Sequence, residues 1–128
     1  MILVDTSVIA AWLDPNHPHH SSCAAALEHW EDRDALAVSS ITCAELAAAG
    51  RTREAIDEML EGFTQLDYDF DSAFKAGQAF GRWHEGKTKK AVLPDFLIRG
   101  QASNLALRHL TNDTHQLRAF PEVEFVFP

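Results

Sequence analysis

The chain of 128 residues has the length of one domain, and its 46% hydrophobic content excludes a disordered chain on composition. Its net charge of −8 argues against a general nucleic-acid binder, although residues 82–99 carry five basic residues against two acidic ones, a net of +3. No apolar run reaches the length of a bilayer span and the start lacks a signal-peptide pattern, so we expect a soluble, cytoplasmic protein without membrane contact, folded as a single domain over 1–128.

Strands and helices alternate along the first half of the chain. The short apolar run 2–4 stops at Asp5, as a buried parallel strand does. Apolar periodicity, capping residues and turn residues then predict further strands at 35–38 and 63–67, and helices at 6–13, 21–32, 41–49 and 52–62.

The second half continues the alternation. A clear helical spacing begins after Asp69 or Asp71 and stops at Gly86, and a loop follows at 87–92. The remaining elements are a helix from Pro94 to about 105, a strand at 108–110, a short turn or helix at 116–119 and a last strand at 123–127. This order predicts an α/β fold with a largely parallel sheet and helices on both of its faces.

Four acidic residues stand where a strand ends or a helix begins: Asp5, Glu45, Asp95 and Asp113. In open α/β sheets, ligands bind beyond the carboxyl ends of the strands, near a switch in strand order. Carboxylates brought together there repel one another unless a cation lies between them. The four positions therefore indicate a divalent-metal site suited to phosphodiester chemistry.

Each acid also has a purely structural interpretation. Asp5 is a possible helix N-cap, and Glu45 fits the third position of a capping box that starts at Thr42. Asp95 suits the positive end of a helix dipole, and Asp113 suits a turn. The metal interpretation rests on the joint occurrence of all four acids at equivalent ends of the predicted elements.

Several segments together resemble the PIN-domain ribonucleases, most closely their VapC-like toxin branch. The matching segments are Leu3–Ser7, Ser40–Glu45, Leu93–Ile98, Thr111–Asp113 and Phe120–Pro121. The resemblance implies a three-layer α/β/α sandwich with a mostly parallel central sheet, and cleavage of RNA with Mg²⁺ or, as a substitute, Mn²⁺. It also implies a homodimer neutralised by a small cognate antitoxin with a basic segment.

The resemblance further implies roles for individual residues. Asp5, Glu45, Asp95 and Asp113 correspond to the catalytic, metal-binding cluster, with Thr6 and Thr111 as supporting hydroxyls. The basic residues nearest the third segment are candidates for binding RNA phosphates: Lys87, Lys89, Lys90 and Arg99.

Three features depart from the family pattern. Asn112 stands where a basic residue is common, and the segment after Asp113 is short. Arg99 replaces the small residue expected one turn after Asp95, and three interpretations of it stay open: it grips a phosphate, pairs with an acid, or lies solvated on its helix.

Two other function classes remain open. A phosphatase or phosphotransfer domain also keeps acids at strand ends, but one such class requires an Asp-x-Asp-x-Thr pattern, and Thr6 and Ser7 follow Asp5 here. A non-catalytic PIN-like binding module would retain the fold without the chemistry.

Overall fold

The computed structural model describes residues 1–84 and 93–128. The elements in these ranges are β1 (Ile2–Val4), α1 (Thr6–Leu13), α2 (His20–Glu31), β2 (Leu36–Ser39), α3 (Ser40–Ala48), α4 (Arg53–Met59), β3 (Thr64–Leu66), α5 (Phe70–His84), α6 (Leu93–Asn104), β4 (Arg108–Leu110), the short 3₁₀ helix η1 (Leu117–Ala119) and β5 (Phe125–Val126). The predicted alternation of strands and helices is confirmed. The loop expected at 87–92 lies outside the described residues.

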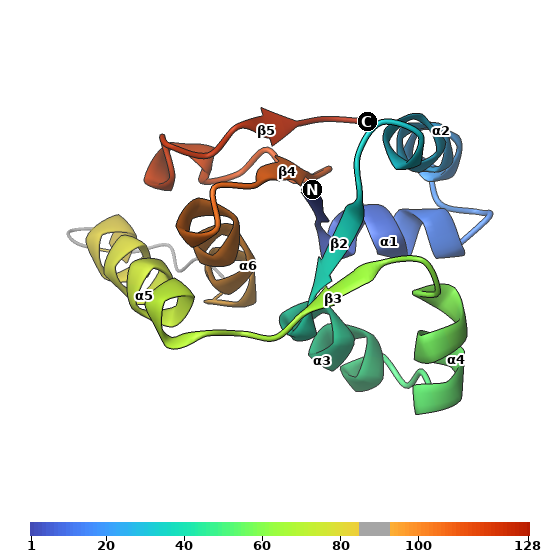
Figure 1. Ribbon diagram of the computed structural model, residues 1–128, viewed down its shortest axis with the longest axis horizontal. Helices are drawn as coiled ribbons and strands as arrows, with labels where there is room; N and C mark the ends of the chain where they lie inside the picture. The colour runs from blue at the N-terminus through green and yellow to red at the C-terminus, as the bar shows by residue number, and fades with distance from the viewer. Residues whose placement is uncertain (85–92) are drawn as a thin grey trace.

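The sheet has the strand order β3-β2-β1-β4-β5, and every neighbouring pair is parallel. The chain moves outward from β1 through β2 to β3, then returns to the other side of β1 to form β4 and β5 (Figure 1). The strand order therefore reverses between β1 and β4, which is where open α/β sheets bind ligands. Asp5 and Thr111 directly follow these two strands.

Helices cover both faces of the sheet, as predicted. Alternate side chains of a strand point to opposite faces, so Ile2 and Val4 pack against α1 to α4 while Leu3 packs against α5 and α6. Figure 1 shows α5 and α6 on one side of the sheet and the first four helices on the other. The three-layer sandwich implied by the resemblance is confirmed.

Three predicted elements are shorter than expected, and one of them is β3, which spans Thr64–Leu66 instead of 63–67. The helix predicted over 52–62 spans Arg53–Met59. Thr52 is its N-cap, and the Thr52 hydroxyl accepts a 3.2 Å hydrogen bond from the Ala55 amide. The helix stops at Met59 because Gly62 takes a φ of +88° and turns the chain into β3. The last strand is limited to Phe125–Val126. Within the described ranges, none of the helices is both long and apolar enough to span a membrane.

The contact between α5 and α6 depends on a glycine. A Cβ atom added to Gly100 would lie 2.6 Å from the Cβ of Ala76, which is fully buried on α5. We expect Gly100→Ala to lower the free energy of unfolding by about 1–3 kcal/mol, because backbone on both sides would have to move.

Gly77→Ala is the matched control: nothing lies within 4 Å of its added Cβ. Alanine should stabilise that position by up to about 1 kcal/mol through helix propensity. Urea unfolding of both variants measures the difference, and equal stabilities would contradict the packing argument.

Candidate metal centre

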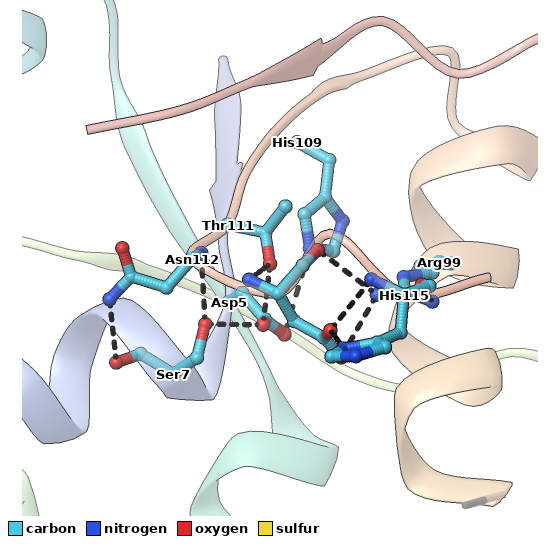
Figure 2. Close-up of polar contacts among 8 residues, drawn as sticks. Asp5, Ser7, Arg99, His109, Thr111, Asn112 and His115 are labelled. Carbon is cyan, nitrogen blue, oxygen red and sulfur yellow. Dashed lines mark hydrogen bonds and ion pairs between the residues drawn. The ribbon is translucent and has the colours of Figure 1, made fainter. Parts of the chain in front are cut away.

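Asp5 lies at the point where β1 meets α1. It holds the N-cap position of α1, as one interpretation of the sequence had it, but its side chain makes no capping hydrogen bond, so capping does not account for the carboxylate. The residue is only 6% exposed. Its Oδ2 atom accepts hydrogen bonds from the Ser7 hydroxyl at 2.7 Å and the Thr111 hydroxyl at 2.9 Å. The carboxylate is therefore fixed by donors from two separate parts of the chain (Figure 2).

The same two hydroxyls hold the loop after β4 in place. The Ser7 hydroxyl accepts the Asn112 amide at 3.2 Å, and the Thr111 hydroxyl accepts the Asp113 amide at 3.0 Å. Each hydroxyl thus accepts a hydrogen bond from a backbone N–H of this loop and donates one to the Asp5 carboxylate. The local folding of the switch point and the orientation of the Asp5 carboxylate are set by one hydrogen-bonded network.

The imidazole of His109 lies on the other side of this carboxylate. Its Nε2 atom is 3.6 Å from Oδ1 of Asp5, beyond an ordinary hydrogen bond, and neither ring nitrogen has a hydrogen-bond partner among the described residues. Burial alone would raise the pKa of the Asp5 carboxyl. Its contacts with His109, Ser7 and Thr111 outweigh burial and hold that pKa well below its usual value.

Glu45 reaches the same region from α3. Its Oε1 atom accepts a 2.7 Å hydrogen bond from the hydroxyl of Thr6, which also lies 2.8 Å from the hydroxyl of Thr42. Helix α3 begins at Ser40 and is capped by Ser39, so the capping box predicted from Thr42 is wrong. Partial burial, and then the nearby charge of Asp5, raise the pKa of Glu45.

Asp95 lies in the first turn of α6 and is half-buried. Burial is the largest cause that raises its pKa to about 6, and the negative charges of Asp5, Asp113 and Glu45 raise it further, while Arg99 acts in the opposite direction. Interaction with all three of the other acids means that the fold brings the four carboxylates into one electrostatic environment.

Asp113 lies in the loop after β4 and is held by cationic or donor groups on both oxygens. Its Oδ1 atom accepts the His115 amide at 2.9 Å and lies 2.8 Å from Nδ1 of the same residue. Its Oδ2 atom forms an ion pair with Nη2 of Arg99 at 3.3 Å. Asp113 therefore has the turn contact expected of its position and a tertiary ion pair as well.

Arg99 differs from the solvated helix arginine that was one interpretation of the sequence. It is 2% exposed, and its guanidinium points toward the loop that contains His115 (Figure 2). That interpretation is wrong, and the interpretation as a partner of an acid is confirmed by the ion pair with Asp113. This burial also leaves Arg99 without the exposed face that the predicted contact with RNA phosphates requires.

The four acids are electrostatically coupled, but they are not drawn together around a point. In residues 1–84 and 93–128, no three acidic, histidine or cysteine side chains are already arranged to hold a metal ion. The supporting threonines contact the acids directly, Thr6 at Glu45 and Thr111 at Asp5. Every donor in the set is oxygen, which is the ligand type that Mg²⁺ and Mn²⁺ take in proteins.

Comparisons with known proteins identify the family of this chain. The family model described as "PIN domain" matches residues 2–123. The chain belongs to the PIN-domain family. A comparison with curated protein sequences finds no significant match.

Solved structures of PIN-like architecture align with nearly the whole chain. A chain of VapBC2 from Rickettsia felis, bound to a DNA fragment from its promoter, has a TM-score of 0.77 at 20% identity, covering 100% of this PIN domain and 99% of that chain. FitAcB from Neisseria gonorrhoeae gives 0.72 at 26% identity, covering 98% and 96%. A toxin–antitoxin complex from Klebsiella pneumoniae gives 0.73 at 21% identity, covering 96% and 95%.

Sequence reasoning missed three residues that organise this PIN domain. Ser7 has no role of its own among the sequence predictions, whereas its hydroxyl donates a 2.7 Å hydrogen bond to Asp5. His109 and His115 carry no sequence signal: one is a buried strand residue and the other lies in a turn.

Asn112, the departure from the family pattern, turns inward, and its Nδ2 atom lies 3.0 Å from the sulfur of Cys23. The predicted RNA-binding residues Lys87, Lys89 and Lys90 lie outside the described residues.

Proposed function

We propose that this PIN domain is a divalent-metal-dependent endoribonuclease and the toxin of a type II toxin–antitoxin pair. The proposal is carried by acidic residues around the switch point of the sheet: Ser7 and Thr111 fix Asp5 there, and Asp95 lies within range of the charges of Asp5, Glu45 and Asp113. A fold that holds like charges together is stabilised when a cation binds among them.

Mg²⁺ or Mn²⁺ is the proposed cofactor, because an all-oxygen set of carboxylates suits a hard divalent ion. Asp5 and Asp95 are the proposed principal ligands, direct or through water, with Glu45 beside them and Asp113 either at a second ion or outside the coordination shell. When bound, the ion lowers the pKa of water and neutralises charge on the phosphate.

The chain's own residues supply orientation and proton transfer. The Ser7 and Thr111 hydroxyls both donate hydrogen bonds to Oδ2 of Asp5 and so fix the orientation of the whole carboxylate, including Oδ1. The Thr6 hydroxyl orients the carboxylate of Glu45, whose raised pKa makes it a better proton acceptor. Glu45 takes the proton of the water that attacks phosphorus, the new P–O bond forms, and the bond to the leaving oxygen of the RNA breaks.

The proposed partners follow from the relatives and from one exposed surface. The aligned VapBC and toxin–antitoxin structures support an antitoxin as partner. The net charge of −8 suits a small antitoxin with a basic segment. Phe70 and Phe74, one turn apart on α5, are 95% and 67% exposed, and such apolar surface supports a protein partner, including a second copy in a homodimer.

RNA cleavage by the purified protein tests the proposal. We expect cleavage of a mixed-sequence RNA with Mg²⁺, its loss in EDTA and its return with added Mg²⁺ or Mn²⁺. Hydrolysis of a chromogenic phosphate monoester, run in parallel, identifies a phosphatase instead. An absence of both activities, with no binding of either ion, would identify a non-catalytic module and contradict the proposal.

A further inference from the structure

Arg99 is a large cationic side chain buried beside the acidic cluster. Its Nη1 atom donates a 2.8 Å hydrogen bond to the His115 carbonyl, and its Nη2 atom lies 3.4 Å from the Asp113 carbonyl oxygen and 3.3 Å from Oδ2 of the Asp113 side chain. The guanidinium also lies over the Phe125 ring, 5.8 Å from its centroid. Burying an arginine is costly unless its charge is paired, so these contacts are what makes the position tolerable.

The consequence for Asp113 is that both of its oxygens are already used. Oδ1 takes the amide and Nδ1 of His115, and Oδ2 takes the guanidinium of Arg99. Asp5 differs, because the hydrogen bonds that it accepts both fall on Oδ2, while its Oδ1 atom lies 3.6 Å from Nε2 of His109. A divalent ion that bound Asp113 would have to displace a hydrogen-bonded guanidinium, whereas His109 at Oδ1 of Asp5 lies beyond hydrogen-bond distance.

Arg99 also acts on the rest of the cluster. Asp95 and Arg99 lie four residues apart on α6, about one helical turn, so their opposite charges attract each other. A guanidinium and a divalent cation interact with the same carboxylate oxygens, and both offset the same repulsion between acids. Arg99 therefore supplies positive charge beside Asp113 that a second ion would otherwise have to supply.

We infer that Arg99 is an internal counter-cation that keeps Asp113 out of the metal's coordination, so that this PIN domain holds a single divalent ion on Asp5, Glu45 and Asp95. The inference rests on the proposed function and deepens it. Asp113 is then a positioning residue: it anchors the loop after β4, whose Thr111 hydroxyl donates to Asp5 and whose backbone amides donate to the Ser7 and Thr111 hydroxyls.

Calorimetric titration with Mn²⁺ tests the inference without any assay of cleavage. Wild type should bind a single ion per chain. Asp95→Asn should weaken binding by about tenfold or more, whereas Asp113→Asn should change it by less than about threefold, below the effect usual for a metal-supporting group. Two ions in wild type, or an equal loss in Asp113→Asn and Asp95→Asn, would overturn the inference. Thermal melting confirms that each variant is folded.

A second pair of variants tests the charge itself. Arg99→Met keeps much of the side-chain length without the cation and should gain a second Mn²⁺ or bind the first about tenfold more tightly, because Asp113 is released. Arg99→Lys keeps the charge and should still bind a single ion. Unchanged binding in a folded Arg99→Met protein would overturn the inference, and if that variant does not fold, the Asp113→Asn comparison decides.

The two proposals fail in different ways. If wild type binds no Mn²⁺, or if Asp5→Asn and Asp95→Asn bind it as wild type does, the proposed metal-dependent nuclease fails as well. If those two variants lose binding and Asp113→Asn loses it equally, only the role assigned to Arg99 fails.

Discussion

Replacement of Asp95 by asparagine is expected to abolish RNA cleavage and at the same time to stabilise the metal-free fold. The pKa of Asp95 is raised from its usual 3.8 to about 6 in the folded chain. The stability that this group contributes is therefore fully present below about pH 4 and is lost as the pH rises through about 6. At neutral pH the ionised carboxylate destabilises the fold, and an uncharged asparagine does not.

The size of this stabilisation is modest because Asp95 is only half-buried. Discounted for solvent screening, the gain is on the order of 1 kcal/mol, or about 3–5 °C in melting temperature at neutral pH in EDTA. The gain should vanish near pH 4. Asp71→Asn is the matched control, since Asp71 is an exposed acid in the first turn of α5. A melting temperature that falls in Asp95→Asn, or rises equally in Asp71→Asn, would show that ionised Asp95 does not destabilise the fold as proposed.

Asp5→Asn is expected to abolish cleavage with the opposite effect on stability. Its carboxylate is buried, and its pKa is held well below the usual value by His109, Ser7 and Thr111 despite the opposing effect of burial. The ionised form therefore stabilises the fold at neutral pH, and this stability is lost as the pH falls through the lowered pKa. We expect a loss of about 1–3 kcal/mol in free energy of unfolding and a fall of about 100-fold or more in kcat/KM.

Circular dichroism and cleavage assays at neutral pH and permissive temperature separate the two effects. The folded Asp5→Asn protein should be inactive while its secondary structure is unchanged. Full cleavage by this variant would remove Asp5 from the proposed metal centre. The pair of substitutions is informative because both should inactivate the protein while they shift stability in opposite directions.

Sequence patterns were sufficient for most of the fold. The strand at residues 2–4, the end of α3 before Gly50 and the start of α6 around Pro94 all agree with the local sequence signals. The parallel sheet followed from the alternation of elements. The end of α4 was less predictable, because it depends on the left-handed backbone of Gly62 rather than on apolar periodicity.

The site was only partly predictable, because its organisation depends on contacts between distant parts of the chain. Strand and helix ends located the four acids, but nothing local shows that Thr111 bonds to Asp5, 106 residues away. The burial of Arg99 was equally hidden, since a helical arginine is usually exposed and only the fold places Asp113 opposite it. The capping box suggested for Glu45 failed because Ser39 caps that helix instead.

The ionisation of Asp95 tests the central claim, that four carboxylates share one environment built for a divalent cation. A pH titration of the ¹³C-labelled Asp95 carboxyl by NMR should give a pKa of about 6 in EDTA, as burial and the neighbouring acids require. Saturating Mg²⁺ should lower this pKa, because the ion binds the ionised cluster. A metal-free pKa near 3.8, or one that Mg²⁺ leaves unchanged, would contradict the account.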